Sequence, residues 1–200
     1  MSETAKCIAD FLQKEHFVEM EASGRHVHLT EEAVQTLFGH GLTPKSPLSQ
    51  PGQYVCQERV ALQGPKGVLE RVAILGPVRK ENQAELSLTD AVTLGITVPV
   101  RLSGDTKNAP TVTVIGEKGQ ALCPAIAAMR HIHMTPADAN RHGLKQGDGI
   151  RLRAVTDRPL VFEDVKVRIS EDFATRVHLD YDEANACHFK KGDLGMILRG

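Results

Sequence analysis

The sequence predicts a mainly β fold, and the pattern of apolar segments is the first observation behind that expectation. From about residue 52 to 124 these segments are short and are separated by turn signals such as Gly64-Pro65-Lys66-Gly67, and the C-terminal third repeats the style. Strands of this length joined by tight turns are typical of a small β-barrel or sandwich. The clearest segments are residues 54–62, 68–75, 98–102, 111–115, 149–155, 160–169, 176–179 and 194–198.

An internal repeat is the second observation. Residues 25–30 read Arg-His-Val-His-Leu-Thr, and residues 130–135, about 105 residues further on, read Arg-His-Ile-His-Met-Thr. Each copy leads into a helix start: Thr30 precedes two glutamates, which suit the positive end of a helix, and Thr135 precedes a proline at the first helical position. Two copies with the same helix-start chemistry predict two related β-domains.

Helices are expected to be brief apart from one at the N-terminus. The run Ser87-Leu88-Thr89-Asp90 opens a short helix that stops near Gly95. Residues 3–15 form a three-turn amphipathic pattern. This N-terminal helix either caps the domain behind it or docks on a partner protein through its apolar side. That side consists of Ala5, Ile8, Phe11 and Leu12.

Composition excludes several classes of function. The chain is 41% hydrophobic and 24% charged with a formal net charge of −1, whereas binding to nucleic acid or a membrane surface favours a strongly basic chain. No apolar run approaches the roughly 20 residues that span a bilayer, and acidic residues interrupt any N-terminal signal sequence. We therefore expect the protein to stay inside the cell, with buried, structural thiols rather than disulfides or zinc-finger ligands. The cysteines are Cys7, Cys56, Cys123 and Cys187.

The two His-x-His pairs suggest metal ligation. In a strand, residues i and i+2 point to the same face, so each pair presents two imidazoles on one side. Neutral imidazole binds zinc, cobalt, nickel or copper, and a catalytic zinc usually needs a third protein ligand. One isolated pair is more often a surface or core feature that only forms hydrogen bonds, but the duplication favours ligation. On spacing alone, Glu85 and His178 are two among many candidates for the third ligand.

Seven segments together resemble the PduL-type phosphotransacylase (phosphate propanoyltransferase) family, in the family's order and from about residue 18 to the C-terminus. The resemblance implies two β-barrel domains with short helical caps, one formed by residues 17–24 plus 129–200 and the other by residues 25–128. Residues 1–16 would form the N-terminal helix, which resembles encapsulation helices. The segments are RHVHLT, GPVRKENQAE, SLTDAVTLGI, PVRLSGD, RHIHMTPADANRHGLKQGD, LVFEDVKVRIS and HLDYDEANA.

The resemblance also implies the site residues. Two divalent metal ions, expected to be zinc, would each be held by three side chains, and Arg79 in the GPVR motif would bind phosphate. The first ligand set is His26, His28 and Glu85, and the second is His131, His133 and His178. The positions that match contacts with coenzyme A are Ser23, Gly24, Lys66 and Asn185.

Four features depart from the family pattern. Gly24 stands where relatives carry Asn, the segment Val18-Glu19-Met20-Glu21-Ala22 is unusually acidic, and Tyr181 and His188 stand where Thr and Gly are common. None removes an implied metal ligand. They bear on the coenzyme A contacts and hence on the acyl preference.

The resemblance implies a metal-dependent phosphate acyltransferase of a bacterial microcompartment, such as one for propanediol utilization. It would interconvert propanoyl-CoA or acetyl-CoA plus phosphate with acyl phosphate plus coenzyme A, by direct attack in a ternary complex. Residues 3–15 would dock on shell or core proteins of the microcompartment. Whether the protein forms a homo-oligomer is not decided by the sequence. Two other functions also stay open: a metallohydrolase, since clustered metal sites often activate water, and a non-catalytic, metal-stabilised barrel that binds partners.

Overall fold

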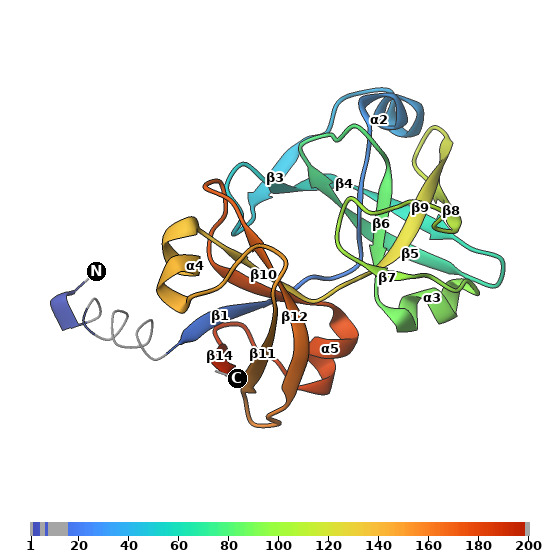
Figure 1. Ribbon diagram of the computed structural model, residues 1–200. Coiled ribbons are helices and arrows are strands. Elements are labelled where there is room, and N and C mark those ends of the chain that lie inside the picture. Colours follow the sequence, from blue (N-terminus) through green and yellow to red (C-terminus); the bar gives the residue numbers. More distant parts are fainter. Residues whose placement is uncertain (1, 5–6, 8–15, 199–200) are drawn as a thin grey trace. The chain divides into compact units, whose positions relative to one another are not determined.

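The computed structural model describes residues 2–4, 7 and 16–198 (Figure 1). The described chain is mainly β with a few short helices, as the apolar pattern predicted. It divides into two compact units: Gly24–Met129 forms one, and Arg130 onward together with the residues up to Ser23 forms the other. Most of residues 3–15 lie outside the described residues, so the N-terminal helix stays a prediction.

The unit formed by Gly24–Met129 contains a closed ring of six strands in the order β4-β5-β2-β6-β9-β8, in which β8 pairs back to β4. Strands β3 and β7 extend the sheet by pairing with β4 and β9. We refer to this unit as the central barrel. Its strands are β2 (His26–His28), β3 (Pro44–Pro47), β4 (Tyr54–Gln63), β5 (Val68–Gly76), β6 (Gln83–Leu86), β7 (Val100–Arg101), β8 (Thr111–Ile115) and β9 (Gln120–Ala128).

The other unit, which we call the terminal barrel, is also a closed ring of six strands, in the order β1-β13-β10-β12-β11-β14. The alternatives of barrel and sandwich are therefore resolved in favour of a barrel in both units. Its strands are β1 (Phe17–Ala22), β10 (His131–Met134), β11 (Gly149–Val155), β12 (Val161–Ile169), β13 (Arg176–Leu179) and β14 (Leu194–Leu198).

The two rings share one pairing pattern, which confirms that the domains are related. In both, the His-x-His strand runs parallel to one neighbour (β5 or β12) and antiparallel to the other (β6 or β13). The next strand in each ring, β9 or β1, runs parallel to that antiparallel neighbour. Each His-x-His strand also follows, in sequence, a strand of the other ring: β1 precedes β2, and β9 precedes β10. The two repeats therefore exchange their first strands.

Four helices of the described chain carry the capping signals that the sequence contains. The Thr30 and Thr135 side chains accept hydrogen bonds from backbone N–H groups three residues on, each at 3.1 Å. Ser87 with Asp90, and Asp180 with Glu183, form reciprocal capping boxes. Gly95 ends the helix that Ser87 opens, as predicted. The helices are α2 (Glu31–Phe38), α3 (Leu88–Leu94), α4 (Pro136–His142) and α5 (Tyr181–Ala186), and none of the described helices is long and apolar enough to cross a membrane.

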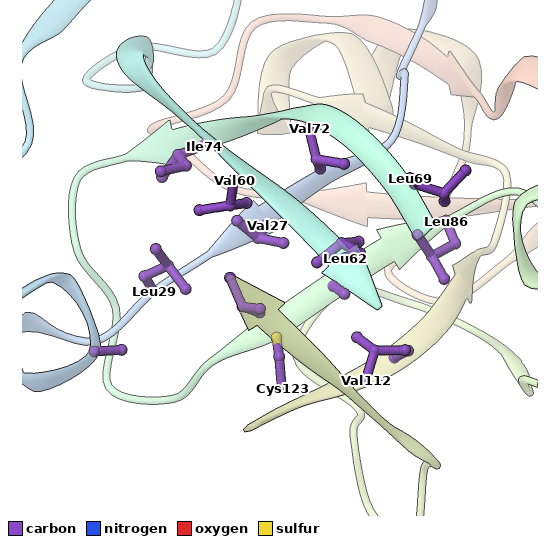
Figure 2. Packing of buried hydrophobic residues seen from close by; sticks show 14 of the residues in the cluster. Val27, Leu29, Val60, Leu62, Leu69, Val72, Ile74, Leu86, Val112 and Cys123 are labelled. Atoms are coloured by element: carbon purple, nitrogen blue, oxygen red, sulfur yellow. The ribbon is translucent and has the colours of Figure 1, made fainter. Parts of the chain in front are cut away.

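Inward-facing side chains fill the central barrel (Figure 2). Val27 on β2 lies among Val60, Leu62 and Ile74 from β4 and β5, all essentially inaccessible to solvent. Burying an aliphatic side chain of this size contributes about 1.5–3 kcal/mol. The core therefore holds β2 and its neighbours in a fixed register, and that register positions the histidines on either side of Val27.

Three of the four cysteines are buried thiols, as expected. Burial raises the pKa of the Cys56 thiol to about 11 and that of Cys123 to about 12. Cys187 is buried as well, and desolvation raises the pKa of its thiol. The expectation is wrong for Cys7, which is exposed and belongs to neither hydrophobic core of the described residues.

Candidate metal centres and phosphate site

The first ligand set assembles on two adjacent strands of the central barrel. His26 on β2 is the register partner of Glu85 on the antiparallel β6, and His28 lies two residues further on the same face. One donor atom from each of the three residues lies within 4.8 Å of the others, and all three side chains are buried. Glu85 Oε1 is 3.6 Å from His26 Nε2 and 3.4 Å from His28 Nε2. The cluster is compact enough for its donors to converge on one ion.

The electrostatics of this cluster suit a cation. Burial lowers the pKa of His28 to about 4, so its imidazole is neutral near pH 7. Burial also opposes ionisation of Glu85, but the charge and hydrogen bonds of the two histidines outweigh it and hold the pKa of that carboxyl well below its usual value. Burial opposes protonation of His26 too, yet attraction to Glu85 raises the pKa of that imidazole. An ionised carboxylate and a neutral imidazole are ready donors.

A backbone contact sets the tautomer of His26. Its Nδ1 lies 2.8 Å from the carbonyl oxygen of Gly24, and since a carbonyl only accepts, Nδ1 must carry the hydrogen. In the neutral ring the lone pair is then on Nε2, the atom that faces Glu85. Hydrogen bonds of this kind orient metal-ligating histidines in proteins. The donor set therefore fits a divalent ion, with Gly24 as the outer partner of one ligand.

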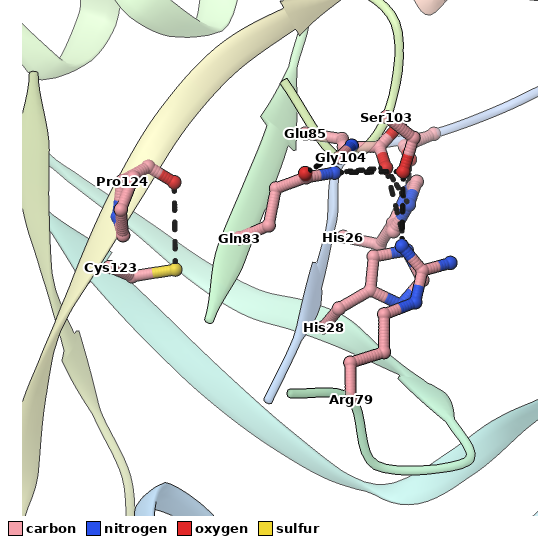
Figure 3. A network of polar contacts seen from close by, with 10 residues as sticks. His26, His28, Arg79, Gln83, Glu85, Ser103, Gly104, Cys123 and Pro124 are labelled. Atoms are coloured by element: carbon pink, nitrogen blue, oxygen red, sulfur yellow. Dashed lines mark hydrogen bonds and ion pairs between the residues drawn. The ribbon is translucent and has the colours of Figure 1, made fainter. Parts of the chain in front are cut away.

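Arg79 lies beside this ligand set, on the loop that follows β5 (Figure 3). Its backbone N–H donates to the carbonyl of Leu29 at 2.8 Å, and its Nη1 donates to Ser103 Oγ at 3.0 Å. Ser103 also accepts from Gln83, which donates to Glu85, so the guanidinium lies two hydrogen-bonded residues away from the ligand set. The structure thus brings the predicted phosphate-binding side chain to the first ligand set.

Two polar residues that sequence reasoning did not single out complete this region (Figure 3). Gln83 Nε2 donates to Glu85 Oε1 at 2.6 Å and to Ser103 Oγ at 2.9 Å, and the backbone N–H of Gly104 donates to Gln83 Oε1 at 2.7 Å. Gln83 was findable in the sequence, because it lies two residues before Glu85 and hence on the same strand face. Ser103 follows β7 on a loop, where strand periodicity gives no signal.

The second ligand set has the same geometry in the terminal barrel. His131 on β10 is the register partner of His178 on the antiparallel β13, and His133 lies two residues further on. One donor atom of each histidine lies within 4.8 Å of the others. The ring of His131 stacks on that of His178 with centroids 5.0 Å apart. His178 therefore occupies the position that Glu85 has in the central barrel.

The surroundings of the second set differ from those of the first. Arg176 stands where the central barrel has Gln83, since it is the register partner of His133 just as Gln83 is of His28. It forms ion pairs with Glu19 at 3.0 Å and Glu21 at 3.5 Å. Glu21 Oε2 also lies 4.0 Å from His178 Nδ1. The acidic segment noted in the sequence thus lies on β1, next to the second ligand set.

The arginine of each repeated hexamer has a structural partner. Arg25 Nε lies 3.0 Å from Asp90 Oδ1, and Arg130 Nη1 lies 2.7 Å from Glu183 Oε1. Both acids are the third residue of a helix that starts three residues after a predicted metal ligand, Glu85 or His178. These ion pairs tie the start of each His-x-His strand to the helix that follows the third ligand.

The predicted coenzyme A contacts are distributed over both units. Gly24 and Lys66 belong to the central barrel, where Lys66 is exposed on the turn between β4 and β5 and its backbone N–H donates to the carbonyl of Leu94. Ser23 and Asn185 belong to the terminal barrel, where Asn185 is exposed on α5. These contacts stay a prediction.

Comparison with known proteins gives one consistent family. A family model described as phosphate propanoyltransferase matches residues 19–190. Three similar curated proteins bear the same name: one from Listeria monocytogenes, 54% identical over 91% of this chain and 87% of its own; one from Clostridioides difficile, 44% identical over 100% and 97%; and one from Thermotoga maritima, 47% identical over 96% and 93%. The chain therefore belongs to the phosphate propanoyltransferase family, a family of acyltransferases.

Proposed function

We propose that this enzyme interconverts a short-chain acyl-CoA (propanoyl-CoA or acetyl-CoA) and phosphate with the acyl phosphate and free coenzyme A, in a metal-dependent reaction. The observation that carries the proposal is the position of Arg79 beside the buried cluster of His26, His28 and Glu85. A guanidinium group next to a metal-ligand set suits a reaction between an anion, which the guanidinium binds, and a carbonyl group, which the metal polarises. Membership of the family supports the same reaction.

The metal-ligand sets would hold two divalent ions, with zinc the expected species. Two imidazoles with a carboxylate, or three imidazoles, are the three-ligand sets of catalytic zinc, which leave one coordination position for water or substrate. Zinc held by His26, His28 and Glu85 would supply Lewis-acid stabilisation of the charge that develops on the thioester oxygen or the departing sulfur. The burial of these three side chains keeps competing water away from the donors.

Arg79 would orient the phosphate. Its guanidinium presents planar, paired N–H donors that match two phosphate oxygens, and its charge is permanent. Ser103 restrains the guanidinium through Nη1, so less side-chain freedom is lost when phosphate binds. Holding phosphate in line with the carbonyl carbon supplies much of the rate in a two-substrate reaction.

The transfer would occur by direct attack in a ternary complex. A phosphate oxygen forms a bond to the carbonyl carbon, the bond between that carbon and sulfur breaks, and coenzyme A leaves as a thiolate. The raised pKa values of the Cys56, Cys123 and Cys187 thiols argue against an acyl-cysteine intermediate, because the thiolate is the nucleophilic form. Trapping an acyl-enzyme after a single turnover without phosphate would contradict direct attack.

A steady-state assay separates this function from hydrolysis. Thiol release from acetyl-, propanoyl- and butanoyl-CoA should depend strictly on added phosphate, and acyl phosphate should appear at the same rate. A metallohydrolase would release thiol without phosphate and yield the free acid. A non-catalytic barrel would release thiol under neither condition.

We also propose that residues 3–15 direct the enzyme to a bacterial microcompartment by docking on its shell or core proteins. The support is the amphipathic pattern of that segment. Deleting residues 3–15 should abolish co-purification with assembled shells and leave turnover unchanged. Co-purification of the shortened chain would refute the docking role.

A further inference from the structure

We infer that Gln83 is a positioning residue that couples the first metal-ligand set to the phosphate-binding arginine. This inference rests on the proposed function and adds a physical connection between its two parts. Gln83 is only 3% exposed, on β6, and its amide group contacts both Glu85 and Ser103 (Figure 3). A buried amide must find partners for its polar atoms, and each partner of Gln83 belongs to this region.

The first arm of the connection fixes the metal-ligand carboxylate. Gln83 Nε2 donates to Glu85 Oε1 at 2.6 Å, and the same oxygen is the one that faces the Nε2 atoms of His26 and His28. The hydrogen bond restrains rotation of the carboxylate and keeps that oxygen turned toward the imidazoles. Partners of this kind, behind the ligands themselves, commonly change metal affinity by about 10- to 100-fold when they are removed.

The second arm reaches the arginine. Ser103 Oγ accepts from Gln83 Nε2 at 2.9 Å and from Arg79 Nη1 at 3.0 Å, which uses both lone pairs of the hydroxyl. Gly104 N–H donates to Gln83 Oε1 at 2.7 Å, so the loop after β7 is held by the same amide. An unbroken series of hydrogen bonds therefore runs from Glu85 through Gln83 and Ser103 to Arg79.

The chemistry of the amide explains why glutamine suits this place. Its two N–H groups serve two acceptors at once, and its oxygen serves a backbone donor, all without adding charge beside Glu85. Arg176, at the equivalent position of the terminal barrel, pairs with Glu19 and Glu21 instead. Among the described residues, the series of hydrogen bonds thus accompanies the ligand set beside Arg79, whereas the arginine at the equivalent position of the other set forms ion pairs with carboxylates.

Four variants test the inference, with metal affinity as a readout besides activity. Gln83→Met keeps the side-chain volume and removes all three hydrogen bonds, whereas Ser103→Ala interrupts only the arm to Arg79. The double variant combines them. Gln63→Met makes the same change at an exposed position on β4 of the same barrel and serves as the matched control. Zinc dissociation constants come from chelator competition, and KM values for phosphate and acyl-CoA come from initial rates.

Gln83→Met should weaken zinc binding about 10-fold and raise the KM for phosphate by a similar factor, with little change in the KM for acyl-CoA. Ser103→Ala should raise the KM for phosphate but leave zinc affinity at the wild-type value. The double variant should raise the KM for phosphate by less than the product of the two single effects, because both substitutions interrupt the same series of hydrogen bonds. Gln63→Met should match the wild type.

Unchanged zinc affinity in Gln83→Met, or an unchanged KM for phosphate in Ser103→Ala, would overturn the inference, and the second result is decisive even if Gln83→Met fails to fold. Absence of phosphate-dependent turnover in the wild-type enzyme would instead refute the proposed function. The zinc measurement then still decides whether Gln83 supports the ligand set.

Discussion

At the scale of single residues, the first candidate site combines four kinds of side-chain group that have three separate tasks. Imidazoles and a carboxylate gather within 4.8 Å of one another, a guanidinium lies beside them, and an amide joins the two. Because these groups are buried, each needs its hydrogen-bond or ionic partner: a polar group left without a partner away from water costs about 1–3 kcal/mol of free energy. Small substitutions here should therefore have large and separable effects.

Arg79→Lys should raise the KM for phosphate about 10- to 100-fold, as expected when a charge-assisted hydrogen bond of about 1.5–3 kcal/mol is lost. Lysine keeps the charge but not the planar fork of donors. Initial rates at varied phosphate and varied acyl-CoA measure the effect. Arg71→Lys makes the same change at an exposed position on β5 of the same barrel and is the control. Equal losses in the use of phosphate and acyl-CoA would mean that Arg79 has a structural role.

At the scale of elements, each ligand set is positioned by a strand pair and by a capped helix. The third ligand position, Glu85 or His178, lies two residues before a capping box, and the arginine of the hexamer pairs with the acid of that box. Strand register and helix capping thus act on the same few residues in both barrels. This explains why the hexamer repeats its arginine as well as its histidines.

Asp90→Ala should lower the free energy of unfolding by about 1–3 kcal/mol, because it removes half of a capping box and leaves Arg25 without its carboxylate. Urea titration measures the change. Thr89→Ala alters an exposed residue of the same helical turn and should have a much smaller effect. Equal stability of the two variants would show that the ion pair and the box contribute nothing.

Asp157 links the turn between β11 and β12 to the segment before β14. Hydrogen bonds from Lys190 and His188 lower the pKa of its carboxyl to about 2, below the usual value of 3.8. Because this pKa is lower in the folded than in the unfolded state, the ionised carboxylate stabilises the folded state above pH 3.8. That contribution is lost as the pH falls toward 2. Asp157→Asn should therefore lower the melting temperature slightly at pH 7, less so in high salt, and match the wild type near pH 2. A pH-independent difference in melting temperature would contradict this assignment.

The sequence predicted the parts of the site that follow from local periodicity. A period of two places both members of a His-x-His pair on one face, and the duplicated hexamer indicated two such pairs. Periodicity did not identify the third ligand of each set, because the pairing of His26 with Glu85 depends on the register between β2 and β6. The resemblance to a known family identified these third ligands. Ser103 escaped notice because a loop brings it to Arg79.

At the scale of the whole molecule, the chain consists of two repeats that each contribute a strand to the other ring. β1 precedes the His-x-His strand of the central barrel but completes the terminal barrel, and β9 does the reverse. The exchange makes the central barrel continuous in sequence and the terminal barrel discontinuous. The short N-terminal strand is therefore essential to a ring whose other strands all come from the C-terminal part.

Removing residues 2–22 should destabilise the terminal barrel, because the deletion takes β1 and leaves β13 and β14 without their shared neighbour. Removing residues 2–15 retains β1 and should leave the melting profile of both barrels unchanged. A fragment of residues 24–129 contains a complete ring and the first ligand set, and should bind one zinc ion. Equal stability of the two shortened chains would show that β1 is dispensable.

The central claim is that a metal held by these ligand sets and a phosphate held by Arg79 act together on an acyl-CoA. The most direct test follows acyl phosphate formation and thiol release in parallel, in metal-stripped enzyme and after zinc is restored, with His26→Ala alongside. The account predicts that both products vanish on stripping, return together with zinc in the wild type, and do not return in the variant. Full phosphate-dependent turnover by metal-free protein would contradict it.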